Sequence, residues 1–387
     1  MPLRVVFNSS KVRPDQVEKV SGILSDAGLL TRHVFSLQSM SRKALDLARR
    51  TSLEREPYSR IQRRLNERRQ ASLIELLWPM PGETLDSFKD GVDDLLGIGA
   101  QGFLIFPLIW LNNTAYREHT AEYGVTVLPE EDPSGGGEIV VSTNEVSFPE
   151  YLDGLRFALA VYLLHDCRGL YATLQLLNTL GVARFRDVVD AFGAWMDEQT
   201  EGLIAELWRA RLASFEDMVN YAWRGEFADA VLHAHRKEFD RMIAGFIASR
   251  GEWFQGPHGE LLRGVVEYDL LCRPYAFLQT KSEVGTALEH TAIVRSKPRY
   301  YLVRAQFDFP RIIRTLRRGD TLSAADLEQG SYLLEIDHRT AQLFLFPNRT
   351  LDESRWQCTQ AVQEIARIEP LCKLFADESA QGMPAVG

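Results

Sequence analysis

Cysteine is scarce in this chain of 387 residues, and the four that occur are far apart. They are Cys167, Cys272, Cys358 and Cys372, and no pair has the short spacing typical of a zinc or iron–sulfur site. The eight histidines show no ligand pattern either, because His233 and His235 would point to different faces of a helix. We therefore predict free thiols and no metal site held by this chain alone.

Long apolar runs and a basic surface are also missing. No apolar stretch reaches the ~18–20 residues of a membrane span, and the longest, Leu155–Leu164, is interrupted by Arg156. The N-terminus lacks the long apolar core of a signal peptide. The net charge of −9 argues against duplex nucleic acid as the main partner, and the arginine-rich run 60–69 is typical of a solvated helix face. We expect a cytoplasmic protein that binds neither membrane nor nucleic acid.

Strand-like and helical segments alternate over the first 110 residues. The expected strands are Leu3–Phe7, His33–Leu37, Leu73–Trp78 and Gly102–Ile109. The expected helices are Pro14–Ala27, a stretch from Ser41 that Tyr58–Gln70 extends, and Leu85–Leu96. Strands that are apolar on both faces and separated by helices indicate parallel βαβ units, so we predict an α/β fold, either a wound sheet or part of a βα barrel.

Four such units make only half of an eight-stranded barrel. The first strand, Leu3–Phe7, begins almost at the start of the chain, and a bare apolar edge invites mispairing. We therefore expect something beside this strand: an N-terminal half, a partner chain, or a later part of the same chain.

The rest of the chain changes character twice. We expect a loop-rich excursion over Asn112–Glu145, helices from Phe148 to about Arg250, and a connector at Gly251–His258. A small α+β module should follow, with strands Tyr300–Phe307, Ser331–Ile336 and Ala341–Phe346, a hairpin turn over Asp337–Leu343 and a helix Ser354–Ile368. The predicted boundaries are 1–145 for the βα part, 146–295 for the helical region, 296–376 for the α+β module and 377–387 for the tail.

Polar, turn-forming residues end each of the four N-terminal strands. They are Asn8, Ser9 and Ser10 after the first; Gln38 and Ser39 after the second, with Arg50 on the next helix; Pro79, Met80, Pro81 and Gly82 after the third; and Trp110, Asn112 and Asn113 after the fourth. Because the carboxyl ends of parallel strands meet at one edge, these residues should share one rim, where ligands bind. Taken singly, each cluster is equally an ordinary turn or helix cap.

The order of these features resembles the second half of the barrel of radical S-adenosylmethionine (radical SAM) enzymes. The turn WPMPGET, from Trp78, resembles that family's Gly-Leu-Pro-Gly-Glu-Thr-like turn, although Trp78, Pro79 and Met80 stand where Gly and Leu are usual. The resemblance covers residues 3–125, and the helical part to about residue 200 is similar to the cobalamin-binding members, which include many methyltransferases.

The resemblance implies a role for each cluster. Asn8, Ser9, Ser10, Gln38, Ser39 and Arg50 would contact S-adenosylmethionine, Pro79–Gly82 would lie near its adenine, and Trp110, Asn112 and Asn113 would face a small-molecule or peptide substrate. The family holds a [4Fe–4S] cluster on a C-x-x-x-C-x-x-C motif, which this chain lacks, and we find no cobalamin-binding Asp-x-His-x-x-Gly segment. No catalytic residue is assigned.

Two functions follow from this pattern. The first is the C-terminal portion of a cobalamin-dependent radical SAM enzyme, with methyl transfer the expected chemistry and with barrel strands four to seven in this chain. The [4Fe–4S] cluster and cobalamin would then require a separate N-terminal part, and this chain alone would be inactive. The second is a binding or scaffold subunit derived from that family, without a cluster and without catalysis.

Overall fold

A computed structural model gives the architecture of the chain. It describes residues 5–8, 16, 19–20, 22–24, 27, 30–49, 55–67, 71–112, 114–129, 137–219, 222–273, 288–289, 291–297, 300–317, 320–328, 330–335 and 373–374. The predicted strand 341–346, the predicted turn 337–343 and the predicted helix 354–368 lie outside these residues.

A four-stranded parallel sheet forms the N-terminal part. Its strands are β1 (Val5–Asn8), β2 (Leu30–Gln38), β3 (Ala71–Trp78) and β4 (Phe103–Pro107), in the spatial order β1-β2-β3-β4. All three neighbouring pairs are parallel, and Phe35, Ile74 and Phe103 share one level of the register. The predicted α/β class with parallel strands is therefore confirmed.

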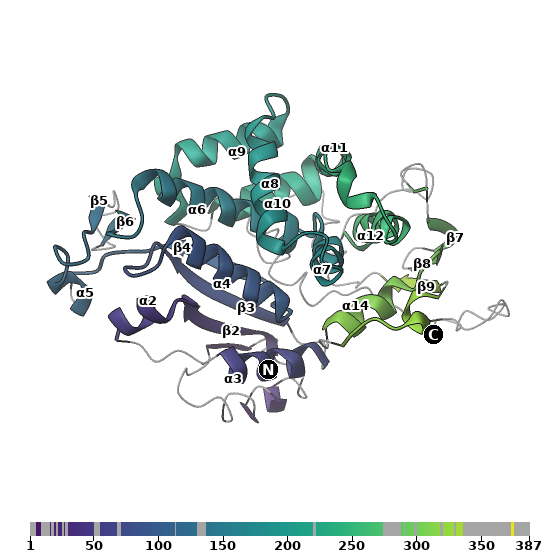
Figure 1. Ribbon diagram of the computed structural model, residues 1–387, viewed down its shortest axis with the longest axis horizontal. Helices are drawn as coiled ribbons and strands as arrows, with labels where there is room; N and C mark the ends of the chain where they lie inside the picture. Colours follow the sequence, from purple (N-terminus) through teal and green to yellow (C-terminus); the bar gives the residue numbers. More distant parts are fainter. Residues whose placement is uncertain are drawn as a thin grey trace.

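Helices cover one face of this sheet. Helices α3 (Arg55–Glu67) and α4 (Leu85–Gly97) both pack on it, with Tyr58 edge-on to Phe35 at 5.4 Å and Phe88 stacked on Trp78 at 4.5 Å between ring centroids (Figure 1). The opposite face carries a separate apolar group of Val34, Leu73, Leu104 and Phe106. The predicted helical stretch from Ser41 is two helices, because α2 (Arg42–Leu47) ends well before α3 begins.

The helical region packs against α4 and the end of β3. Its helices are α6 (Phe148–Val161), α7 (Tyr171–Thr179), α8 (Phe185–Asp197), α9 (Leu203–Ala213), α10 (Ala222–Asp229), α11 (Arg236–Ala248) and α12 (Gly259–Cys272). Trp78 donates its ring N–H to the Tyr151 carbonyl at 3.1 Å, and a Cβ at Gly154 would lie 2.2 Å from that ring, so α6 approaches the strand closely. No helix within the described ranges is long and apolar enough to cross a membrane.

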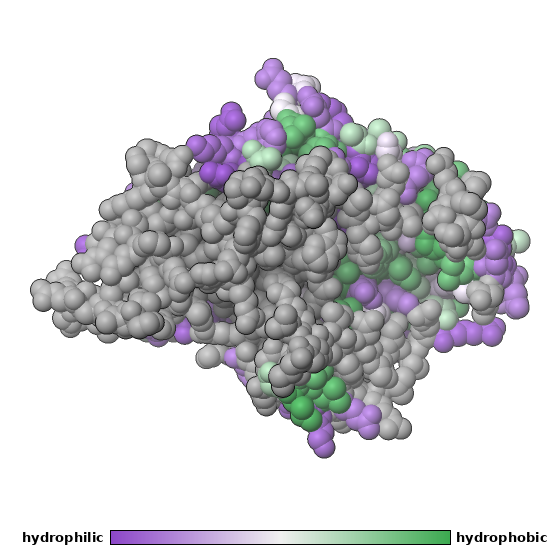
Figure 2. Space-filling model, turned by 180° about the vertical axis from the view of Figure 1, so that it is seen from behind, coloured by the Kyte–Doolittle hydropathy of each residue, from purple (hydrophilic) through white to green (hydrophobic). Residues whose placement is uncertain are grey.

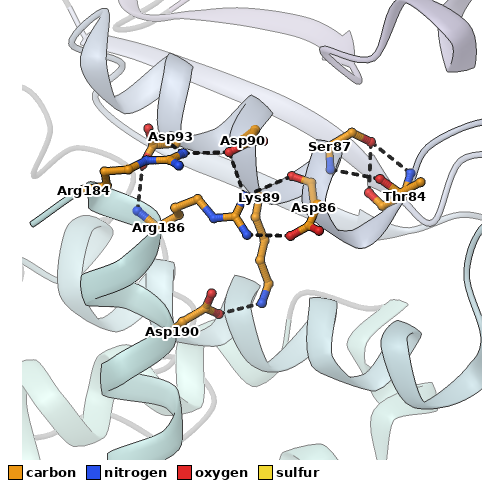
Figure 3. Close-up of polar contacts among 9 residues, drawn as sticks. All are labelled: Thr84, Asp86, Ser87, Lys89, Asp90, Asp93, Arg184, Arg186 and Asp190. Atoms are coloured by element: carbon orange, nitrogen blue, oxygen red, sulfur yellow. Dashed lines mark hydrogen bonds and ion pairs between the residues drawn. The ribbon is translucent and has the colours of Figure 1, made fainter.

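Ion pairs join α4 to α8. Figure 3 shows the Arg186 guanidinium between Asp86 and Asp90, at 2.6 and 2.7 Å, and Lys89 reaching Asp190 at 2.7 Å. Arg184 adds a second contact to Asp90 at 2.7 Å. The two helices are thereby held together by a network of charges as well as by the core beneath them.

Two segments contain more structure than the sequence indicated. The excursion after β4 contains α5 (Ala115–Glu118) and an antiparallel hairpin of β5 (Thr126–Pro129) and β6 (Glu138–Ser142). The connector begins with a 3₁₀ turn, Gly251–Phe254.

The C-terminal sheet has the strand order β10-β9-β8-β7. Strands β8 (Tyr300–Ala305) and β9 (Gly330–Glu335) lie close to the predicted ranges. Strands β7 (Thr291–Lys297) and β10 (Lys373–Leu374) were not predicted. Helix α14 (Phe309–Arg317) lies beside these strands in Figure 1.

The outer edge of β4 is covered. Asp166 accepts the Phe103 N–H at 3.3 Å, and Arg224 donates to the Phe103 carbonyl at 2.8 Å. Pro107 has no N–H to offer, and just beyond it the Val140 N–H of β6 donates to the Leu108 carbonyl at 2.9 Å. Side chains, a proline and a hairpin therefore occupy the side of β4 on which a further strand would pair, whereas β1 pairs on one side only among the described strands.

Candidate functional site

The carboxyl ends of β2 and β3 meet at one rim of the sheet. Gln38 ends β2 in the left-handed region, at φ +69°, and Ser39 follows it, 2% exposed. Beyond β3, Pro79–Gly82 is buried, and the Trp78–Pro79 peptide is cis. Asn8 ends β1, while Ser9, Ser10, Arg50 and Asn113 lie outside the described residues.

A buried hydrogen bond connects the two strand ends. The Ser39 hydroxyl donates to Oε1 of Glu83, and the Ser41 N–H donates to the Ser39 oxygen at 2.9 Å. Glu83 is 1% exposed, and its other oxygen, Oε2, has no hydrogen-bond partner in the part of the chain that the structure describes. Burial raises the pKa of Glu83 to about 8, partly opposed by the bond from Ser39, so the carboxyl is mostly protonated at neutral pH.

Helix α2 and the loop after β6 cover the turn beyond β3. Gly82 has φ +86°, and a Cβ there would lie 2.8 Å from Cδ1 of Leu47. Its N–H donates to Oε2 of Glu145 at 3.0 Å, and Nζ of Lys43 lies 2.7 Å from Oε1 of the same carboxylate. Burial alone would raise the pKa of Glu145, but the hydrogen bonds from Lys43 and Gly82 and the Lys43 charge lower it. The ionised carboxylate therefore ties the turn to α2.

Trp110 lies inside this rim. It is 1% exposed, stacks on Tyr116 at 5.3 Å between centroids, and donates its ring N–H to the Thr120 hydroxyl at 3.0 Å. Tyr116 donates its hydroxyl to the Ala44 carbonyl of α2 at 3.4 Å. Asn112 is exposed. The aromatic pair thus connects the end of β4 with the helix that covers the β3 turn.

The rim fits a ligand that supplies hydrogen-bond donors. Oε1 of Gln38 is buried and, like Oε2 of Glu83, has no partner among the described residues. S-adenosylmethionine carries amino and hydroxyl groups that such acceptors bind. The described residues do not fit a [4Fe–4S] cluster: no group of three His, Cys, Asp or Glu side chains is placed for a metal in the described ranges, and Cys167 and Cys272 lie in the helical region.

A second group of buried charges, in the helical region, supports the chain reversal before α7. Asp269 accepts the N–H groups of Ala172 and Thr173, each at 2.8 Å, and Arg273 donates to the carbonyls of Arg168 and Gly169, at 3.3 and 2.9 Å. Burial raises the pKa of Asp269 to about 6, although its hydrogen bonds oppose the rise. These side chains satisfy backbone groups that a helix end leaves unpaired, which is a structural role.

Sequence reasoning missed Glu83 as a candidate site residue, treating it only as an acidic group that favours the start of α4. One signal in the sequence could have identified Glu83 as a site residue. It immediately precedes the N-cap Thr84, and the capping box of Thr84 with Ser87 closes the start of α4 without Glu83. The burial of its carboxyl depends on contacts from other elements of the fold, which sequence spacing does not report.

Comparison with known proteins gives two relatives, while no protein-family model matches the chain. One relative is the cobalamin-dependent radical SAM methyltransferase TokK of Streptomyces tokunonensis, 27% identical over 199 residues, which are 48% of this chain and 29% of that protein. Another is the 2-(S-pantetheinyl)-carbapenam-3-carboxylate methyltransferase of Streptantibioticus cattleyicolor, 28% identical over 192 residues, which are 45% of this chain and 28% of that protein. The match spans less than a third of either relative's length. Over about half of its length, this chain is similar to one cobalamin-dependent radical SAM methyltransferase and to a second methyltransferase.

Proposed function

We propose that this chain is the C-terminal portion of a cobalamin-dependent radical SAM enzyme and that the complete assembly transfers a methyl group. One relative is named as such an enzyme, and both are named as methyltransferases. The observation that carries the proposal is the strand-end rim, where Gln38 and Glu83 hold buried acceptor atoms without partners among the described residues. Parallel sheets bind ligands at this edge.

The proposed scaffold is half of a βα barrel. Strands in sequential order with helices on one face are the arrangement of a βα barrel, in which the second face lines the interior. In this proposal residues 1–145 form the half barrel, the helical region begins at 146, and 377–387 form a tail. The C-terminal module begins at β7, Thr291, and not at the predicted residue 296, because β7 belongs to its sheet.

The missing half would join at β1. The edge of β4 is covered, whereas β1 has a described neighbour on one side only. Val20 and Ile23, which follow β1 in helical conformation, are 39% and 61% exposed. Independently of these two residues, the face seen from behind carries an apolar group near its lower edge (Figure 2). We propose that an N-terminal half or a partner chain covers this side and brings the [4Fe–4S] cluster and cobalamin.

Residues of this chain would bind and orient the cofactor. Bound S-adenosylmethionine supplies the methyl group. Gln38 and Ser39, together with Asn8, Ser9, Ser10 and Arg50, would contact it, and Pro79–Gly82 would lie against its adenine. Trp110, Asn112 and Asn113 would face a small-molecule or peptide substrate. Glu145 and Lys43 hold α2 over the turn, which excludes water from this side.

Calorimetric titration of the purified chain with S-adenosylhomocysteine tests the site. We expect saturable binding of one ligand per chain, weakened by Gln38→Ala. The control is Thr179→Ala, at the exposed end of α7. Absence of saturable binding, or equal binding by both variants, would contradict a cofactor site at this rim.

The absent cysteine motif favours a second candidate, a binding or scaffold subunit without catalysis. The DNA upstream of the coding sequence separates the two. An in-frame or adjacent C-x-x-x-C-x-x-C motif would support the divided enzyme, and its absence would support the scaffold.

A further inference from the structure

We propose that Glu83 is a ligand-binding residue: its carboxyl releases its proton to solvent when the ligand binds, and Oε2 then accepts a hydrogen bond from an N–H or O–H group of the molecule held at the strand-end rim. The inference rests on the proposed function, which supplies that molecule as S-adenosylmethionine. It gives a role to a residue that neither the turn motif nor the relatives assign.

The surroundings of the carboxyl carry the argument. Glu83 is 1% exposed, and its Oε1 accepts the hydroxyl of Ser39, which is itself fixed by the Ser41 N–H. Oε2 has no hydrogen-bond partner among the described residues. A buried polar atom without a partner destabilises a fold, so such an atom held at a strand end is a candidate for ligand binding.

A structural role explains Glu83 less well than it explains Asp269, another buried carboxyl. Both oxygens of Asp269 are occupied by groups at the start of α7. The start of α4, by contrast, is already closed by the reciprocal bonds of Thr84 and Ser87, at 3.1 and 2.9 Å. Glu83 therefore leaves unused the oxygen that a purely structural carboxyl uses.

The neighbouring residue points to the same ligand chemistry. Gln38 adopts φ +69°, a region that residues other than glycine rarely occupy, and its Oε1 is also buried without a partner in the described ranges. Two acceptor atoms at one rim that receive no hydrogen bond from the described residues call for a ligand that donates. Amino and hydroxyl groups meet that requirement.

Entry of the ligand involves α2. This helix of six residues lies against Gly82, and its outer contacts are the Lys43–Glu145 ion pair and the bond from Tyr116 to Ala44. The Lys43 side chain is 63% exposed, so the ion pair holds α2 only weakly. Displacement of α2, which also buries Ala44 and Leu45, would uncover the turn.

The test replaces Glu83 by an apolar residue of similar size. We expect Glu83→Leu to melt close to the natural protein, because removal of Oε2, which has no partner among the described residues, offsets the loss of the bond from Ser39. The same variant should bind S-adenosylhomocysteine roughly tenfold more weakly. Glu83→Gln, which keeps an acceptor oxygen, should bind within about threefold of the natural protein. Glu122→Leu, at an exposed site, is the control.

Each other outcome overturns the inference. Unchanged affinity in Glu83→Leu would exclude the contact, and a Glu83→Leu protein that fails to fold while Glu83→Gln folds and binds would make the residue structural. If the natural chain does not bind S-adenosylhomocysteine, the proposed ligand itself is wrong. That outcome differs from one in which the natural chain binds S-adenosylhomocysteine and Glu83→Leu binds it equally well, which would refute only the role of Glu83.

Discussion

Replacing Glu83 by glutamine should change how the stability of the fold depends on pH. Burial raises the pKa of Glu83 from 4.5 to about 8, so between these values the folded chain keeps a proton that the unfolded chain releases. The unfolding free energy of the natural protein therefore falls as pH rises through this window, with a limiting slope of about 1.4 kcal/mol per pH unit. Glutamine cannot ionise, so the variant lacks this contribution.

The magnitude follows from the two pKa values. Between pH 6 and pH 8 the natural protein should lose about 2 kcal/mol relative to Glu83→Gln. Urea unfolding of both proteins from pH 5 to pH 9 measures this difference directly, since other titrating groups are common to both. Parallel pH profiles would refute the reasoning, because they would mean that Glu83 titrates alike in the folded and unfolded chain.

Three further substitutions, one at the rim and two in the helical region, test the packing of the fold by urea unfolding. Gly82→Ala should lower the free energy of unfolding by roughly 2 kcal/mol or more, because φ is +86° and the new Cβ would lie 2.8 Å from Cδ1 of Leu47. In the control Gly251→Ala the new Cβ meets no atom within 4 Å, so the free energy of unfolding should change little. Asp269→Asn should cost about 2–3 kcal/mol by disturbing the bonds to the start of α7; an effect no larger than that of Gly251→Ala would contradict this. Arg186→Ala should cost no more than about 1 kcal/mol, and less in high salt, since Asp86 and Asp90 are exposed; a salt-independent loss would contradict the ion-pair account.

The sequence predicts the N-terminal sheet well because its signals are local. Leu73–Trp78 is an apolar run broken only by Glu75, and the structure extends the strand by two residues to Ala71–Trp78. Thr84 caps α4 next to the predicted start. The β5–β6 hairpin is less visible, since Thr126–Pro129 is only four residues long and Glu138 pairs with Pro129 across a segment rich in glycine and acidic residues.

The site was predicted less completely than the strands, for a physical reason. Spacing places Gln38, Ser39 and Pro79–Gly82 at strand ends, and the structure brings these ends together through Ser39 and Glu83. The spacing of residues along the sequence does not indicate which of these side chains is buried away from water. The burial of Glu83 and the cover over Gly82 come from α2 and Glu145, which lie 35 or more residues away in the chain.

Hydrogen–deuterium exchange of the chain with and without S-adenosylhomocysteine tests the central claim, that the strand-end rim is the cofactor site. Protection is predicted over residues 38–47 and 79–84, with no change in α9, which lies in the helical region. Protection confined to the helical region, or exchange that the ligand leaves unchanged, would contradict it.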